Sequence, residues 1–233
     1  MRPCLRKLCS GFRNLEEGMA MLRQNKWKIL LTTLIILIPI LVGCILWNRL
    51  PDTIATSFGV DSAANGWNSK LFAVLGIPAM IAVVHLFCLV VMSADPKQKN
   101  IGKKPLGIFF WILPCTSLLI STVIYGNAMD VKMDVGFLVC LFLGVLFVMM
   151  GNILPKAGQN YSFGIKLPWT LNDSENWKHT NRFGGWCMVI AGIVIIVTSL
   201  WHNPWFFFGV VFAAAAAPMF YSYIYEKRHG REK

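Results

Sequence analysis

Long apolar stretches constrain the fold of this chain more than any other feature of its sequence. Hydrophobic residues make up 56% of the 233 residues and charged residues only 14%. A helix of about twenty apolar residues crosses the hydrocarbon core of a bilayer, and the chain has six such stretches: Ile29–Trp47, Leu71–Met92, Leu106–Tyr125, Val135–Leu154, Phe183–Trp201 and Trp205–Tyr225. We therefore predict an all-α integral membrane protein, a bundle of six transmembrane helices with a structured outer loop and an amphipathic inner loop.

The basic residues are distributed very unevenly between the two sets of predicted loops. Of the 22 Lys and Arg, only Arg49, Lys70 and Lys132 fall in loops on one side, which leaves 19 for the other. Basic residues in short loops mark the cytoplasmic side of a membrane protein. This predicts that both termini and the loop at 155–182 face the cytoplasm and that the loop at 48–70 faces out. The net charge of +11 then reflects orientation against anionic lipid, so membrane lipid is the first expected partner and direct binding of nucleic acid is not expected.

This topology divides the chain into four regions. They are a basic cytoplasmic head (1–28), two spans joined by an outer loop at 48–70 (29–92), four further spans with an inner loop at 155–182 (93–225), and a basic cytoplasmic tail (226–233). We expect translation to begin at Met19 or Met21, because a few basic residues before the first span suffice. The alternative is an amphipathic head, whose apolar residues recur at helical spacing.

The inner loop is the longest non-apolar segment between spans, and it mixes aromatic rings with cations as segments at a membrane boundary do. Pro155 and Pro168 are expected to end helices, which predicts an irregular first part. Asn172 is the expected N-cap of the next helix, with Glu175 completing a capping box. The loop is either a solvated connector or a functional surface, and we favour the second interpretation.

The outer loop is longer than a helical hairpin needs. Ile54, Thr56, Phe58 and Val60 alternate in a way that predicts a short extended segment, and Asn65–Gly66 is expected to form a turn. This loop is either inert or a compact cap that faces a ligand, and we slightly favour the cap.

The sequence offers no chemistry for catalysis. It lacks the motifs of zinc, serine and phosphate-loop enzymes, has no cluster of Cys and His, and gives no reason to expect an enzyme, a metal or a cofactor. His85 is the one ionisable residue well inside a span; it is either a hydrogen-bonded packing residue or a functional group. Gly144, Gly184, Gly185 and Gly192 are expected to allow helices to approach closely.

The two loops, with their flanking spans, resemble the SdpI family of bacterial immunity membrane proteins over residues 21–225. The outer loop is similar to that family's N-terminal domain of unknown function at Leu50, Pro51, Asp52, Ile54, Phe58, Gly66, Trp67 and Lys70. The inner loop is similar to the family's second pattern at Gly151, Asn152, Leu154, Pro155, Lys156, Asn160, Tyr161, Gly164, Ile165, Lys166, Pro168, Trp169, Thr170, Trp177, Thr180, Arg182 and Gly184. Ala55 and Ser57 replace a Pro and a His of the first pattern, and Asn181 replaces a His of the second.

The resemblance implies a multi-pass protein of the bacterial plasma membrane that confers resistance to a secreted antimicrobial peptide toxin. For one type of member it also implies signalling, in which the toxin-loaded protein holds a cytoplasmic transcriptional repressor at the membrane. The residues implied to bind toxin or partner are Asn160, Tyr161, Lys166, Pro168, Trp169, Thr170, Trp177, Thr180 and Arg182 in the inner loop, and Pro51, Asp52, Phe58, Gly66, Trp67 and Lys70 in the outer loop. The alternative is a small transporter or exporter of a lipophilic compound or peptide. The oligomeric state is left open.

Overall fold

The structure is a computed structural model that describes residues 16–59, 62–201 and 204–229. Its long helices are α2 (Lys26–Ile45), α3 (Ile77–Ser93), α4 (Lys103–Ala128), α5 (Val135–Ile153), α7 (Ser174–Thr198) and α8 (Pro204–His229). A π-helical turn, Phe72–Gly76, leads into α3. These six helices are long and apolar enough to cross a membrane, which confirms the predicted all-α, six-span membrane fold.

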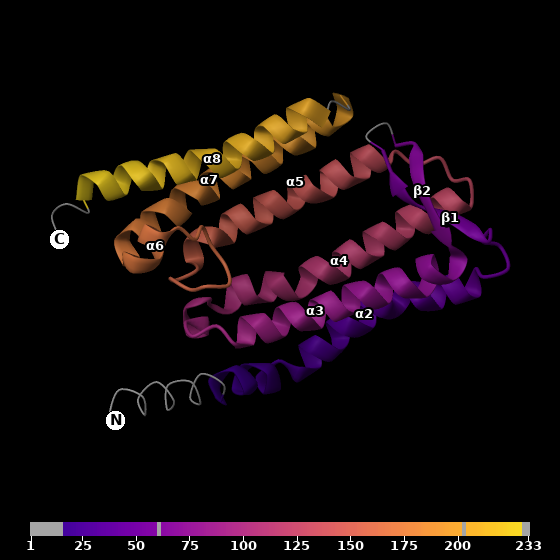
Figure 1. Cartoon of the computed structure of the whole chain (residues 1–233), viewed down its shortest axis with the longest axis horizontal. Helices are drawn as coiled ribbons and strands as arrows, with labels where there is room; N and C mark the ends of the chain where they lie inside the picture. Colours follow the sequence, from indigo (N-terminus) through magenta and orange to yellow (C-terminus); the bar gives the residue numbers. More distant parts are fainter. Residues whose placement is uncertain (1–15, 60–61, 202–203, 230–233) are drawn as a thin grey trace.

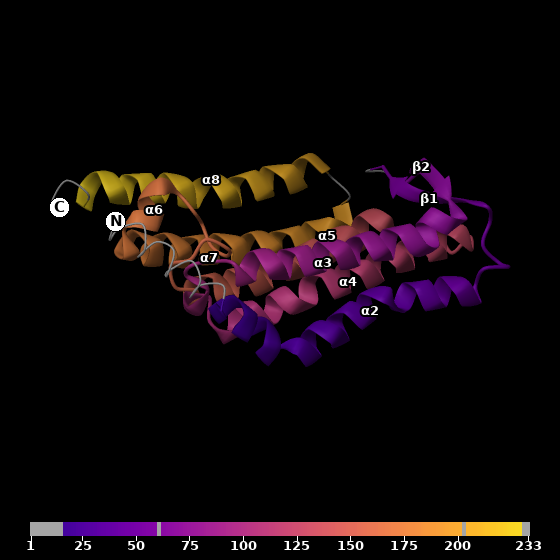
Figure 2. The same ribbon diagram turned by 60° about the horizontal axis from the view of Figure 1, so that its bottom comes forward.

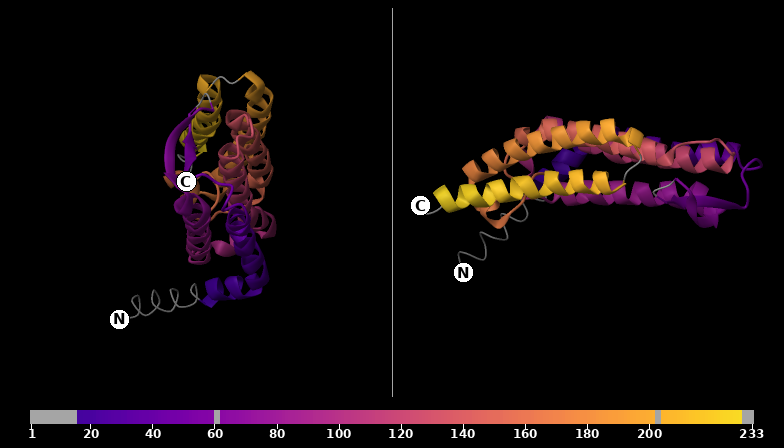
Figure 3. Two further views of the ribbon diagram at one scale, coloured as in Figure 1. Left: turned by 90° about the vertical axis from the view of Figure 1, so that its right-hand side faces the viewer. Right: turned by 90° about the horizontal axis from the view of Figure 1, so that it is seen from above.

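The long helices form two groups of three (Figure 1). We call α2, α3 and α4 the first half, and α5, α7 and α8 the second half. All six helices run along one common direction (Figure 2; Figure 3). A β-hairpin lies at one end of the bundle; the inner loop and the start of α2 lie at the other (Figure 1).

Two short elements continue α5 and α7. The 3-10 turn Leu154–Lys156 follows α5, and the 3-10 turn Ser199–Trp201 follows α7. The second of these turns ends at Trp201, and α8 begins at Pro204. Residues 16–24 are also helical, and Glu17 forms an ion pair with Lys99 at 2.7 Å. Residues 1–15 of the predicted head are not described, and the start of translation stays a prediction.

The first half has an apolar core that contains a few polar groups with partners. Ile36, Val74 and Ile124 are almost fully buried. His85 is fully buried and its Nε2 lies 3.0 Å from the Thr32 hydroxyl, whereas its Nδ1 has no hydrogen-bond partner among the described residues. The packing role and the functional role of this histidine both stay predictions. The Tyr125 hydroxyl donates to the Pro39 carbonyl oxygen at 3.0 Å, which joins α4 to α2 at the helix proline.

The second half depends on glycines that bring α5 and α7 into backbone contact. A Cβ atom added at Gly192 would lie 2.5 Å from the Gly144 carbonyl oxygen, and one added at Gly151 would lie 2.6 Å from the Gly185 carbonyl oxygen. Such an approach suits a membrane interior, where helices associate by packing rather than by expulsion of water. The predicted role of these glycines is confirmed, and Gly184 similarly packs against Pro218 of α8 and against Ile165.

The outer loop folds into a β-hairpin of β1 (Thr53–Phe58) and β2 (Ala64–Ser69), which are antiparallel. The extended segment was predicted, but the turn at Asn65–Gly66 is wrong. The chain reverses between Gly59 and Ala63, where the Gly59 N–H donates to the Ala63 carbonyl oxygen at 2.7 Å. Gly66 instead lies in β2 opposite Ser57, where the register is irregular and a side chain would crowd the partner strand.

The predicted helix boundaries in the inner loop need two corrections. Pro168 does not end a helix: it is the first residue of α6 (Pro168–Asn172), a position that needs no N–H donor. Asn172 is not an N-cap but the last residue of α6. The cap of α7 is Asp173, which is extended and whose carboxylate accepts from the Glu175 N–H at 2.9 Å. The acidic cap therefore lies one residue later than expected.

Gly192→Ala is expected to destabilise the protein, whereas Gly209→Ala is not. The added methyl at Gly192 meets the Gly144 carbonyl oxygen, and overpacking of this kind costs about 1–3 kcal/mol. A Cβ at Gly209, on α8, has no atom within 4 Å, so there the change should bring only the small gain in helix propensity. Thermal unfolding of the two purified variants in one detergent measures the difference. Equal melting temperatures would contradict the role of the glycine contact.

Candidate functional site: the inner loop and its supports

The inner loop starts with a turn built around the side chain of Asn160. This side chain is fully buried, and its Oδ1 accepts from the N–H groups of Ser162 at 2.9 Å and Phe163 at 2.6 Å. Its Nδ2 donates to the Gly158 carbonyl oxygen at 2.7 Å. Asn160 therefore gives the irregular backbone the hydrogen bonds that a helix or sheet would supply elsewhere.

The first turns of α7 support this loop from below. Trp177 is 1% exposed, and its Nε1 donates to the Ala157 carbonyl oxygen at 3.0 Å. Gly164, at φ +128°, lies against the Trp177 ring. Asn181 accepts from the Ile165 N–H at 2.8 Å and donates to the Trp177 carbonyl oxygen at 2.9 Å. In the sequence Asn181 is only a departure from the family pattern, yet its side-chain amide joins the loop backbone to α7 by hydrogen bonds.

A polar network joins α6, α7 and α8. Trp169 Nε1 donates to the Ser222 hydroxyl at 2.8 Å, and that hydroxyl donates to Asn176 Oδ1 at 2.9 Å. Thr180 donates to the same Oδ1 at 2.8 Å, and Asn176 Nδ2 donates to Glu226 Oε2 at 3.0 Å. Sequence reasoning missed Ser222, whose one signal is that it is the only serine in the apolar and aromatic stretch 205–225.

Thr170 stabilises the start of the short helix α6. Its fully buried hydroxyl accepts from the Leu167 N–H at 2.8 Å and lies 3.1 Å from the Ile165 carbonyl oxygen. This arrangement ties the start of α6 to the strand-like segment before it and leaves Pro168 exposed. The position of Trp169, whose ring meets Tyr223 edge-on at 6.1 Å, follows from that anchoring.

A buried carboxylate joins the inner loop to the first half of the bundle. Asp95, in the connection between α3 and α4, is 5% exposed. Its Oδ2 accepts from the Tyr161 N–H at 2.9 Å and from the Ser162 hydroxyl at 2.6 Å, and its Oδ1 accepts from the Lys97 N–H at 2.8 Å. Sequence reasoning missed Asp95, although it is the one acidic residue in a connection rich in lysine.

Further contacts lie on either side of this carboxylate. The Gly158 N–H donates to the Asn100 carbonyl oxygen at 2.8 Å, and Asn100 Nδ2 donates to the Gln159 carbonyl oxygen at 2.8 Å. The Lys97 ammonium donates to Gln159 Oε1 at 2.8 Å and lies 5.4 Å from the centre of the Tyr161 ring. We call these contacts, together with those of Asp95, the inner latch.

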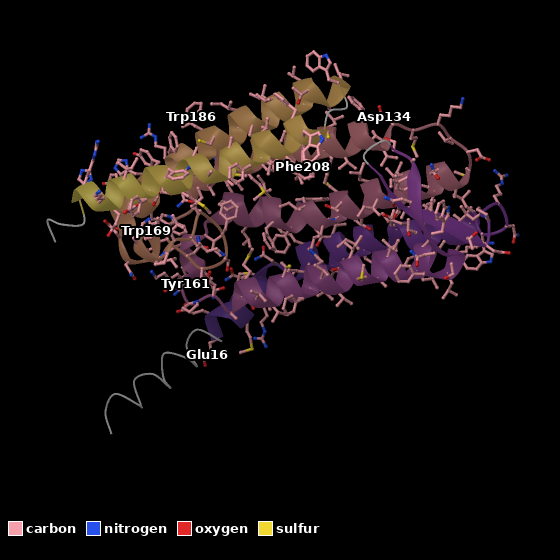
Figure 4. The ribbon with its side chains drawn as sticks, turned by 45° about the horizontal axis from the view of Figure 1, so that its top comes forward. Glu16, Asp134, Tyr161, Trp169, Trp186 and Phe208 are labelled. Carbon is pink, nitrogen blue, oxygen red and sulfur yellow. The ribbon has the colours of Figure 1, made fainter. Side chains whose placement is uncertain are left out.

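The predicted inner-loop residues fall into a buried set and an accessible set. Asn160, Thr170, Trp177 and Thr180 are buried and shape the loop. Tyr161, Lys166, Pro168 and Arg182 are exposed, and Trp169 is partly exposed. Tyr161 and Trp169 both lie at the inner-loop end of the molecule (Figure 4). Only the accessible set can touch a partner without the loop unfolding.

The outer candidates lie at the base and on the strands of the hairpin. The Lys70 ammonium lies 3.1 Å from Asp52 Oδ1, donates to the Trp47 carbonyl oxygen at 3.3 Å and stands over the Trp47 ring. Pro51 is exposed, Trp67 is 61% exposed, Phe58 is partly buried, and Gly66 lies in β2 as described above. Leu50, just before the hairpin, and Ile54 of β1 are buried and belong to the apolar core of the first half.

The tip of the hairpin contacts the second half. The Gly136 N–H donates to the Ser62 hydroxyl at 3.0 Å, and that hydroxyl lies 3.4 Å from Asp134 Oδ1. Asp134 is the N-cap of α5 and also accepts from the Phe137 N–H at 2.9 Å. We call these contacts the outer latch. In the part of the chain that the structure describes, no cluster of His, Cys, Asp or Glu side chains could hold a metal ion.

The segments of this chain that match known protein families include the two loops. Residues 156–222 match the SdpI/YfhL protein family, and residues 34–82 match a domain of unknown function, DUF1648. The chain is 27% identical over 182 residues to "Immunity protein SdpI" of Bacillus subtilis (strain 168), an alignment that covers 76% of this chain and 84% of that protein. No solved structure matches the chain. The predicted resemblance to the SdpI family is thereby confirmed, for a multi-pass membrane protein.

Asp95→Asn is expected to loosen the inner loop. The new amide group places N–H donors where one oxygen now accepts, so at least one of the three donors around Asp95 loses its partner in a buried position. Limited proteolysis of the purified protein with trypsin, which can cut after Lys156 and Lys166, should then proceed faster.

Asp130→Asn is the matched control, because Asp130 is an exposed carboxylate in the α4–α5 connection and Asn also tolerates its positive φ of 57°. Unchanged cleavage rates in both variants would show that Asp95 does not hold the loop.

Proposed function

We propose that this chain is a membrane immunity protein that protects a bacterial cell from a secreted antimicrobial peptide toxin, and that it acts by binding rather than by catalysis. The similarity to an immunity protein over most of both chains carries the proposal. It is supported by the architecture, in which both matched loops are folded, braced structures rather than slack connections.

The outer hairpin is the surface that we propose meets the toxin. The exposed Trp67 ring and the Lys70–Asp52 pair give it an aromatic and polar face on a hairpin that is packed onto the bundle through Ile54. An aromatic side chain on a rigid element provides contact area at little cost in conformational entropy, as in other binding surfaces.

The accessible set of the inner loop is the surface that we propose meets a cytoplasmic partner, such as a transcriptional repressor. The accessible set offers the Tyr161 ring and the cations of Lys166 and Arg182. The loop backbone is held by hydrogen bonds to Asp95, Trp177 and Asn181. Cations beside exposed rings suit an acidic segment of a partner. We do not propose export of the toxin, because coupled transport usually needs charged side chains within the membrane, and the sequence has no Asp, Glu, Lys or Arg in the middle of a span.

We further propose that the inner-loop end of the bundle faces the cytoplasm, on the basis of the basic residues concentrated there. Single cysteines at Ser174 and Thr53, both exposed in the structure, test this orientation. A membrane-impermeant maleimide added to intact cells should label Thr53→Cys and leave Ser174→Cys unlabelled until the membrane is opened. The unsubstituted chain, with its native cysteines, sets the background. Labelling of Ser174→Cys in intact cells would reverse the topology.

Trp169→Ala and Arg182→Ala are each expected to abolish protection while the protein still accumulates in the membrane. The first change removes a ring fixed by Ser222 and Tyr223, and the second removes an exposed cation of the partner surface. Arg182→Lys should retain part of the protection if a bidentate contact is involved. Survival of a sensitive host that expresses each variant and is exposed to the toxin measures the effect, with immunoblots of membranes for abundance.

Trp186→Ala and Lys178→Ala are the controls. Trp186 is a tryptophan of α7 that is 64% exposed (Figure 4), and Lys178 is an exposed cation paired with Glu175. Both variants should protect normally. Full protection by the Trp169 and Arg182 variants would mean that the inner loop only connects two spans. Loss in the controls as well would show a general sensitivity of α7 rather than a binding surface.

A further inference from the structure

We propose that a pocket beneath the inner loop binds one anionic phospholipid, with an acyl chain between α4 and α5 and the phosphate at Lys166. The pocket has a volume of about 300 Å³. One wall is formed by Pro105, Ile108 and Ile112 of α4, and the facing wall by Met150, Ile153 and Met188. This inference is independent of the proposed function, because it needs neither a toxin nor a cytoplasmic partner.

The length of the pocket lies within one leaflet of a bilayer. Pro105, Ile108 and Ile112 lie along the first turns of α4, so this wall is about 10 Å long at 1.5 Å per residue. One leaflet contributes about 15 Å to a hydrocarbon core of about 30 Å. An apolar slot of this length can hold part of a lipid tail.

The polar groups of the pocket gather at one end. Ser162 and Lys166 come from the inner loop, whereas the remaining lining is almost entirely apolar. The exposed Lys166 ammonium donates to the Tyr161 carbonyl oxygen at 3.0 Å, and within the described residues it forms no ion pair with a carboxylate. Lys103 and Lys104 are exposed and immediately precede Pro105, at the start of α4. The Ser162 hydroxyl donates to the Asp95 carboxylate, whose charge is met by three hydrogen-bond donors, so Lys166 is the lining group that can meet a phosphate.

An acyl chain fits this lining better than a rigid ligand. Met150 and Met188 have flexible, unbranched side chains that adapt to an irregular occupant. Phe163 and Ile165 of the inner loop close the slot toward the latch, so a bound tail would pack against the same cluster that supports the loop. The lipid would thus act as a structural filler between the first and second halves.

Native mass spectrometry of the full-length protein in detergent tests the proposal, with dioleoyl phosphatidylglycerol and dioleoyl phosphatidylcholine as probes. Phosphatidylglycerol should bind more tightly than phosphatidylcholine. Lys166→Gln should lower the ratio of the two affinities about fivefold, which is the effect of one lysine near an anionic surface. Ile112→Trp should fill the slot and weaken both lipids. Met188→Phe fills it from the facing wall if the first variant does not fold.

Lys178→Gln is the matched control, because Lys178 is an exposed lysine at the same end of the bundle, is paired with Glu175 and lies outside the pocket. It should bind both lipids as the unchanged protein does. Glycerol phosphate, which has a headgroup but no tails, should not compete. The proposal is overturned if the two lipids bind equally, if Lys166→Gln and Lys178→Gln lose the preference to the same extent, or if glycerol phosphate competes as well as the lipid.

Discussion

A carboxylate that leaves water at a membrane boundary must find hydrogen-bond donors, and Asp95 finds them in the backbone and side chain of the inner loop. This requirement makes the loop part of the fold of both halves. α5 packs far more extensively on α7 than on α4, so the two halves have no comparable helix interface between them. The relative position of the halves therefore depends strongly on the inner latch, which is small in area but rich in polar contacts.

The outer latch provides a second fixed point at the opposite end. Ser62, at a positive φ of 62°, brings the hairpin tip onto the N-terminus of α5, where Asp134 already caps the helix. Each half thus extends one loop to the other half: the first half contributes the hairpin, and the second half contributes the inner loop. α5 begins at the outer latch and leads directly into the inner loop, so one helix joins the two fixed points.

Hydropathy and charge sufficed to predict the six spans, because a bilayer imposes length and composition on each helix separately. The close-packing glycines could also be predicted, since Gly144 and Gly192 lie within apolar helices, where small residues let neighbouring helices approach closely. Asp95 and Ser222 could not be predicted, because their partners are Tyr161 and Trp169, far away in the chain. The turn predicted at Asn65–Gly66 was wrong because Gly66 pairs with Ser57 within the hairpin. The cap predicted at Asn172 was wrong because this residue ends α6, which leaves Asp173 as the N-cap of α7.

The separation of the latch residues along the chain also bears on how the protein is made. Asp95 is synthesised well before Tyr161, and Ser62 well before Gly136, so each latch can close only after its later partner has left the ribosome. Until the inner loop is made, Asp95 has only the Lys97 N–H of its three donors. Its burial therefore waits for the loop between the fourth and fifth spans, which supplies the other two.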